Sequence, residues 1–229
     1  AQLFPETRGR EYHLAYGWVK LKKGKMSSRT GQVVLGEWLL DEVKKRLQEK
    51  FKMEEKTAEI VGVGAVKYSL LKVGLSGDIA FDIDESINLE GDSGPYLQYT
   101  YARCQSVLRK SEIRNPKQET STNDKNSKRL ENSDLENSNI VSNFDIRISN
   151  LSVEELSLLR SLYKFPEIVA SAGNKYSPNL LCGYLFDLAQ KFNSFYNKCS
   201  ILNPQPQKTT SFVATREIRL KLTEATGQI

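Results

Sequence analysis

Metal-binding and redox-active residues are scarce in this chain of 229 residues, which contains one histidine and three cysteines. Cys104, Cys182 and Cys199 lie far apart, and no C-x-x-C pair occurs. A structural zinc site needs about four Cys or His ligands, and a disulfide framework uses an even number of cysteines. The sequence therefore predicts no metal site, and unpaired thiols favour a cytoplasmic location.

Long hydrophobic runs are also missing. No stretch approaches the roughly 18 apolar residues that a membrane-spanning helix needs, and the mean hydropathy is −0.48. Residues 1–13 contain no basic segment followed by an apolar one, which is the pattern of a secretion signal. These absences predict a protein with no membrane partner.

Basic residues exceed acidic ones only slightly: 33 Lys and Arg and 28 Asp and Glu give a net charge of +5. An excess of this size permits a polyanionic partner without requiring one. The chain is long enough for one large domain or two small ones, at roughly 100–200 residues each.

The positive charge is concentrated in residues 17–31, GWVKLKKGKMSSRTG, which include four lysines, one arginine and no acid. Gly24 and Gly31 allow the backbone to approach a ligand closely, and Ser27 and Ser28 add hydroxyl groups. Glycine, hydroxyl and lysine together are typical of a phosphate-binding loop. The Walker A pattern G-x-x-x-x-G-K-[ST] is absent, and the alternative is a solvated basic loop.

Hydrophobic periodicity predicts mainly helices in the first half of the chain. An apolar stripe from Leu40 to Phe51 has helical spacing, and a second helical pattern covers residues 54–73. Gly62 and Gly64 within that pattern indicate that another backbone packs closely there. Residues 79–83 alternate as in a short strand, and Pro95 is expected in the first turn of a further helix.

The second half of the chain is predicted to be helical after a polar stretch. Residues 115–139 contain only two large apolar side chains, so we expect a disordered insertion over 115–143. Ser152 and Glu155 have the spacing of a capping box. Gly173 is expected just beyond the end of the next helix. The helix predicted at 178–197 has an inward seam of Leu181, Leu185, Leu188, Phe192 and Phe195.

The helix predicted at 95–112 has two contrasting faces. Its inward seam is expected to contain Leu97, Tyr101, Cys104 and Leu108. The opposite face carries Tyr99, Arg103, Ser106 and Lys110, with Tyr96 on its flank. Rings, guanidinium groups and cations are the groups that bind single-stranded RNA loops. The alternative is an ordinary polar face with a tyrosine packed under a neighbouring helix.

Residues Lys25, Met26, Ser27, Ser28 and Arg29 resemble the KMSKS signature loop of class I aminoacyl-tRNA synthetases. Ser28 replaces the second lysine, a departure that arginyl-tRNA synthetases often show. Over nearly its whole length the chain resembles an arginyl-tRNA synthetase. The segments that match are 13–19, 24–31, 64–68, 81–82, 90–91, 94–99, 101–103 with Ser106, 184–189, 195–197 and 219–222.

The resemblance implies a mainly α fold, in which a helical-bundle anticodon-binding domain of the DALR type follows the end of a Rossmann-like α/β catalytic domain. Residues 1–35 would be the end of that catalytic domain, residues 36–94 connecting helices with a small strand element, and residues 95–229 the anticodon-binding domain. The HIGH motif of class I enzymes is absent around the single histidine. We therefore expect a C-terminal part of the enzyme, cut at both ends and inactive by itself.

The same resemblance implies the partners and the site residues. Lys25 would be catalytic, and residues 25–29 would bind ATP, a substrate accompanied by Mg²⁺, without any tightly bound cofactor. Arginine and tRNA(Arg) would be the other substrates of the intact enzyme, which we expect to be a monomer. Tyr99, Arg103 and Tyr196 match family positions that contact the anticodon loop. Tyr96 and Lys110, from the polar face of the helix predicted at 95–112, are expected to contact the same region. Two alternatives remain: a non-catalytic RNA-binding module with a vestigial loop, and a helical scaffold protein.

Overall fold

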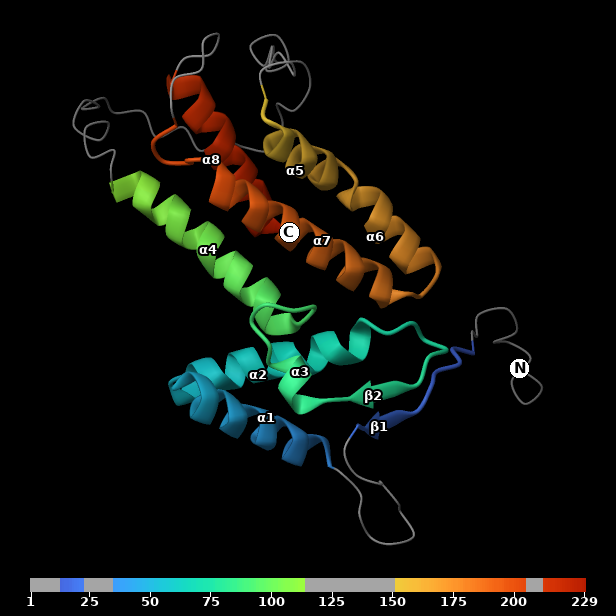
Figure 1. Cartoon of the computed structure of the whole chain (residues 1–229). Helices are drawn as coiled ribbons and strands as arrows, with labels where there is room; N and C mark the ends of the chain where they lie inside the picture. Colours follow the sequence, from blue (N-terminus) through green and yellow to red (C-terminus); the bar gives the residue numbers. More distant parts are fainter. Residues whose placement is uncertain (1–12, 23–34, 114–150, 205–211) are drawn as a thin grey trace, which may run out of the picture. The chain divides into compact units, whose positions relative to one another are not determined.

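The computed structural model describes residues 13–22, 35–113, 151–204 and 212–229 (Figure 1). The KMSKS-like loop at 25–29 and the predicted insertion at 115–143 lie outside these residues. The described chain is mainly helical with a small two-stranded sheet, which confirms the predicted fold class. The elements, in order, are β1 (Val19–Leu21), α1 (Gly36–Phe51), α2 (Glu55–Leu71), β2 (Ile79–Phe81), α3 (Ile83–Ser86), α4 (Gly94–Ile113), α5 (Val153–Tyr163), α6 (Phe165–Asn174), α7 (Pro178–Lys198) and α8 (Phe212–Gln228).

The chain forms two compact units, each built from two segments. Unit 1 contains residues 1–100 and 164–190, and unit 2 contains residues 101–163 and 191–229. The helices α4 and α7 each contribute residues to both units. Among the described helices, none combines the length and the apolar character that crossing a membrane requires.

The core of unit 1 lies between α1 and α2, which pack side by side (Figure 1). Val43 and Leu47 of the predicted stripe are fully buried, whereas Leu40 at one end of it is partly exposed. A Cβ atom added to Gly62 of α2 would lie 3.4 Å from a methyl carbon of Val43 and 3.6 Å from one of Leu47. These are ordinary contact distances, so a methyl group would fit at Gly62, whereas a side chain that extends beyond Cβ would press on α1.

The close backbone approach predicted at the α2 glycines is confirmed at Gly64. A Cβ atom added to Gly94, the first residue of α4, would overlap the carbonyl group of Gly64. A Cβ on Gly64 would in turn strike the side chain of Gln98. Gly94 is therefore needed so that the start of α4 can lie directly on the α2 backbone, whereas a side chain at Gly64 would displace the amide group of Gln98.

The sheet of unit 1 consists of β1 and β2, which pair in parallel with Val19 opposite Ile79 and Leu21 opposite Phe81. The strand predicted at 79–83 ends earlier than expected. Asp82 caps α3 by accepting hydrogen bonds from the backbone N–H groups of Asp84 and Glu85, at 3.0 and 3.2 Å. An aspartate at an N-cap ends the extended segment because its side chain satisfies the first helical N–H groups.

The inward seam predicted for α7 is observed from its middle onward, where Leu188, Phe192 and Phe195 are buried. Leu181 and Leu185 are only half-buried. The prediction that Gly173 follows the end of α6 was wrong, because α6 continues to Asn174. Tyr176 adopts the left-handed conformation after this helix, with φ of 50°.

Unit 2 confirms the capping box at the start of α5. The backbone N–H of Ser152 donates to Glu155 Oε2 at 2.7 Å, and the N–H of Glu155 donates to Ser152 Oγ at 3.2 Å. The other carboxylate oxygen of Glu155 accepts a hydrogen bond from Arg219 Nε of α8 at 2.5 Å, and both side chains are buried. Arg219 Nη1 also donates to the backbone oxygen of Ser200 at 2.9 Å. One buried carboxylate thus joins α5 to α8.

Candidate nucleic-acid interface

The buried face of α4 differs from the predicted seam. Tyr101, expected inward, is 55% exposed, whereas Cys104, Val107 and Ser111 are buried. At Cys104 the helix α8 approaches closely, since a Cβ on Gly227 would lie 3.3 Å from the Cβ of Cys104. A small side chain such as that of cysteine fits this contact. Burial raises the pKa of the Cys104 thiol to about 12, as expected for a core cysteine.

Arg103 does not project away from the protein as predicted, because this rotation of α4 makes it half-buried. Its Nη1 donates to Oδ1 of Asn193 at 2.6 Å. Its guanidinium carbon lies 4.5 Å from the centre of the Tyr196 ring. The distance is that of a cation–π contact, which holds a positive charge against an aromatic face.

Tyr196 combines partial burial with an accessible ring. Its ring lies 6.3 Å from that of Phe192, between centroids, and Phe192 belongs to the core of unit 2. The residue is still 37% exposed. A tyrosine that contacts Phe192 and Arg103 and is still partly exposed can meet an unpaired base without first being ordered.

The other predicted contact residues of α4 differ in their exposure. Tyr99 is 47% exposed and Lys110 is also exposed. Tyr96 is half-buried, and its ring packs against Phe186 with 5.6 Å between centroids. Ser106, expected on the outer face, is half-buried. The structure therefore gives Tyr99 and Lys110 the exposure that binding needs, and Tyr96 a role in packing.

Sequence reasoning missed Asn193, the residue that connects Arg103 to α7. Asn193 and Tyr196 are three residues apart, so they share a face of α7. That spacing was visible in the sequence, but the partner residue on α4 was not. The contact between Arg103 and Asn193 is decided by how the two helices pack within unit 2.

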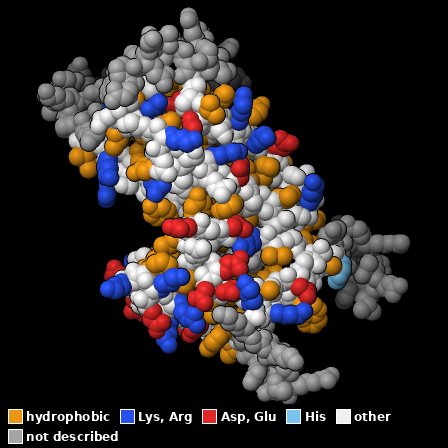
Figure 2. Space-filling view, viewed as in Figure 1, with side chains coloured by type: hydrophobic (Ala, Val, Ile, Leu, Met, Phe, Trp, Pro, Cys, Tyr) orange, Lys and Arg blue, Asp and Glu red, His pale blue; other side chains and the backbone are white. Residues whose placement is uncertain are grey.

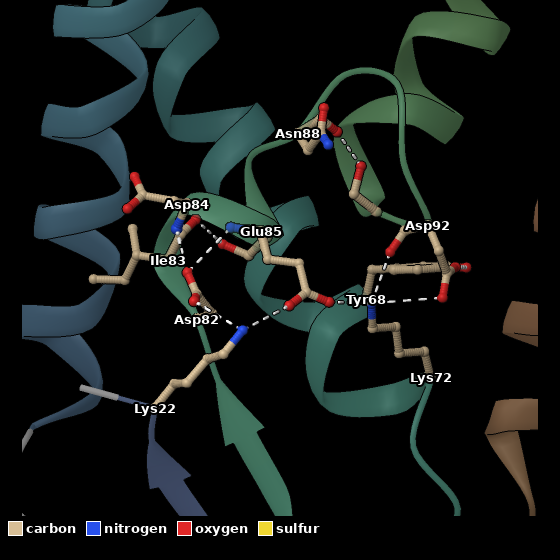
Figure 3. A network of polar contacts seen from close by, with 11 residues as sticks. Lys22, Tyr68, Lys72, Asp82, Ile83, Asp84, Glu85, Asn88 and Asp92 are labelled. Carbon is tan, nitrogen blue, oxygen red and sulfur yellow. Dashed lines mark hydrogen bonds and ion pairs between the residues drawn. The ribbon is translucent and has the colours of Figure 1, made fainter. Parts of the chain in front are cut away.

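A second polar region in unit 1 lies where β1 ends, at Lys22, which is separated from the KMSKS-like sequence by two residues (Figure 3). Lys22 Nζ lies 3.3 Å from Asp82 Oδ2 and 3.7 Å from Glu85 Oε2. Glu85 Oε1 also lies 3.5 Å from Lys72 Nζ of α2. These ion pairs tie the end of β1 to α3 and α2.

The network in Figure 3 continues to the segment before α4. The side chain of Lys72 donates to the backbone oxygen of Asp92 at 2.8 Å. The hydroxyl of Tyr68 donates to Asp92 Oδ1 at 2.5 Å and also lies 3.2 Å from the backbone oxygen of Cys182. Burial and then the hydrogen bond with Asp92 raise the pKa of Tyr68 well above its ordinary value, so the hydroxyl stays protonated.

The acidic residues 82, 84 and 85 hold basic side chains and a helix N-terminus in this structure. The backbone N–H of Glu85, and then Lys22, lower the pKa of the Asp82 carboxyl group, which keeps it charged. Asp84 Oδ1 lies 2.9 Å from Arg46 Nη1.

Figure 2 shows acidic and basic side chains interspersed on the face that it draws. Within the four described ranges, no three His, Cys, Asp or Glu side chains gather so as to hold a metal ion.

Comparison with known proteins identifies the class of the helical part. Residues 97–229 match the model of the DALR anticodon binding domain, and the chain belongs to that family. The chain is homologous to the C-terminal third of arginine–tRNA ligases. It is 36% identical to the arginine–tRNA ligase of Thermococcus sibiricus and 34% identical to that of Fusobacterium nucleatum, over 95% and 96% of the chain.

A solved structure supports the same assignment. The fold is similar to Thermus thermophilus arginyl-tRNA synthetase, with a TM-score of 0.66 and 30% identity over 94% of the chain. The chain spans 32% of that protein, and 32% and 35% of the two ligases above. The predicted resemblance to arginyl-tRNA synthetases is therefore confirmed, and the match covers about a third of each relative's length.

Proposed function

We propose that this chain is the part of an arginine–tRNA ligase that binds the anticodon region of tRNA(Arg) and supplies the KMSKS-like loop for ATP. The family match over residues 97–229, which contains the Arg103–Tyr196 pair, is the observation that carries the proposal. An aromatic ring with a cation against it is the kind of surface that stacks on unpaired RNA bases.

The functions proposed for the three segments of the chain follow from the same homology. Residues 1–35 would complete a catalytic domain, residues 36–94 would connect it, and residues 95–229 would bind tRNA. The intact ligase would activate arginine with ATP, accompanied by Mg²⁺, and transfer arginine to the 3′ end of tRNA. Lys25 and the loop backbone would stabilise negative charge as pyrophosphate leaves. We propose a cytoplasmic monomer.

Tyr99→Ala tests the base-stacking part of the proposal. We expect tRNA(Arg) binding by this chain to weaken by roughly 1–3 kcal/mol, the usual value of one base–aromatic stack. The salt dependence of binding should stay nearly unchanged, since no charge is lost. Arg103→Ala should in addition reduce the slope of log affinity against log salt by about one if Arg103 contacts a phosphate. The measurement is a salt titration of tRNA affinity.

The matched control is Tyr163→Ala, which removes a tyrosine that is 87% exposed on α5, outside the proposed interface. Its tRNA affinity should equal that of the wild type. Thermal melts report whether each variant folds. If Tyr99→Ala unfolds the protein while each folded molecule binds tRNA normally, Tyr99 is a structural residue and not a contact with RNA.

The chain alone should not activate arginine. Its single histidine, His13, stands in no H-x-G-H sequence, and that motif helps class I enzymes to bind ATP. Arginine-dependent exchange of labelled pyrophosphate into ATP should therefore stay at background with the purified chain. Exchange above background would contradict this expectation and would place an ATP site within these 229 residues.

A further inference from the structure

A contact with Asn193 restricts the side chain of Arg103. Arg103 reaches from α4 to α7, where its Nη1 meets Asn193 Oδ1 at 2.6 Å and its guanidinium carbon lies 4.5 Å from the Tyr196 ring centre. A free arginine side chain has many rotamers, and ordering it on binding is unfavourable. A short hydrogen bond from a charged donor is strong enough to restrict it.

The chemistry of asparagine suits this task better than that of an acid. The amide oxygen of Asn193 is neutral, so this hydrogen bond holds the guanidinium group without cancelling its positive charge. An aspartate at the same place would form an ion pair with Arg103 and would also repel a phosphate. This hydrogen bond therefore restricts the direction of Arg103 without itself adding a charge that would repel an anion.

Tyr196 is ordered by the same group of contacts. The guanidinium group of Arg103 lies over the ring, Phe192 lies beside it at 6.3 Å, and part of the residue stays exposed. Asn193 and Tyr196 are three residues apart on α7, so one helix face carries both the residue that holds Arg103 and the ring on which Arg103 lies.

We propose that Asn193 is a positioning residue for tRNA binding: it holds Arg103 over Tyr196, so that the pair is preorganised to receive an unpaired, negatively charged RNA loop. This inference rests on the proposed function, because it names how the same interface binds its RNA. Preorganisation increases affinity because fewer side chains have to be ordered when the complex forms.

Asn193→Asp is the decisive variant, because it preserves the shape and the acceptor but adds a negative charge. We expect tRNA(Arg) affinity to fall about tenfold at low salt, and the salt slope to decrease by about one, because Arg103 becomes neutralised. Asn193→Ala removes the acceptor without adding charge. It should weaken binding by about 2- to 10-fold with little change in the salt slope.

Asn174→Asp is the matched control, because it makes the same change from amide to carboxylate at an exposed position on another helix, α6. Its effect on affinity and salt slope should be small. The inference is overturned if Asn193→Asp behaves like Asn174→Asp in both measurements, or if Asn193→Ala binds as tightly as the wild type. Failure of the wild-type chain to bind tRNA would instead refute the proposed function, and this inference with it.

A spectroscopic measurement separates positioning from simple stabilisation. In an ¹⁵N–¹H spectrum of the free chain, the Arg103 Nε–H signal should show the upfield ring-current shift of a group above an aromatic face. Asn193→Ala should move this signal toward the position seen in Tyr196→Leu, while thermal melts stay close to those of the wild type. An unchanged signal in Asn193→Ala would show that Arg103 is held over Tyr196 without Asn193, and would overturn the inference.

Discussion

Arg219→Met should lower the free energy of unfolding of this chain by about 3–5 kcal/mol. The variant would leave the carboxylate of Glu155 buried without the charged partner that lies 2.5 Å away. In the wild-type protein this carboxylate has a side-chain exposure of 2% and also accepts the N–H of Ser152. A buried charge that loses its partner is among the most destabilising single changes.

Urea unfolding followed by circular dichroism measures this effect. The control is Lys198→Met, which removes the ion pair between Lys198 Nζ and Glu154 Oε1. Its length of 2.9 Å is similar, but the lysine side chain is 65% exposed. Solvent screens such exposed pairs, so the control should unfold close to the wild type. A loss below about 1 kcal/mol in Arg219→Met would show that Glu155 becomes protonated or hydrated at little cost.

The double variant Arg219→Met with Glu155→Leu tests the cause of the destabilisation. If the isolated charge is responsible, removing it should restore a large part of the stability, since apolar side chains can replace a buried ion pair. Recovery should be incomplete, because the leucine also removes half of the capping box at Ser152, which contributes about 0.5–2 kcal/mol. No recovery would mean that packing by Arg219, and not its charge, dominates.

In the intact ligase, Lys25→Ala should slow arginine activation by an amount equivalent to about 2–4 kcal/mol, the usual effect of removing one donor to a developing charge. Affinity for tRNA should change little, because a lysine on the leaving phosphates acts mainly in the transition state. Pyrophosphate exchange measures the first quantity and equilibrium tRNA binding the second.

Lys56→Ala, at an exposed position near the start of α2, provides the control for loss of a lysine. We expect pyrophosphate exchange in this variant to match that of the wild type. An unchanged exchange rate in Lys25→Ala would indicate that the loop is vestigial. The alternative of a non-catalytic RNA-binding module would then be favoured.

Much of the local structure followed from the sequence alone. The helix at 36–51, the helix start at Gly94 and the capping box at Ser152 depend on residues that are neighbours along the chain. The same holds for the family, because its motifs are short and occur in a fixed order. Burial of Cys104 and Cys182 was also predictable, because both lie among apolar residues at helical spacing.

The tertiary structure decided which face of α4 is buried and which residues meet across helices. Periodicity placed Tyr101 inward because large apolar side chains usually form the seam, but the fold buries Cys104 against Gly227 of α8 and leaves Tyr101 exposed. The pairs Arg219–Glu155 and Arg103–Asn193 join residues 64 and 90 positions apart. No local pattern could reveal them, because the partner of a polar side chain is chosen by the packing of helices, which depends on the whole fold.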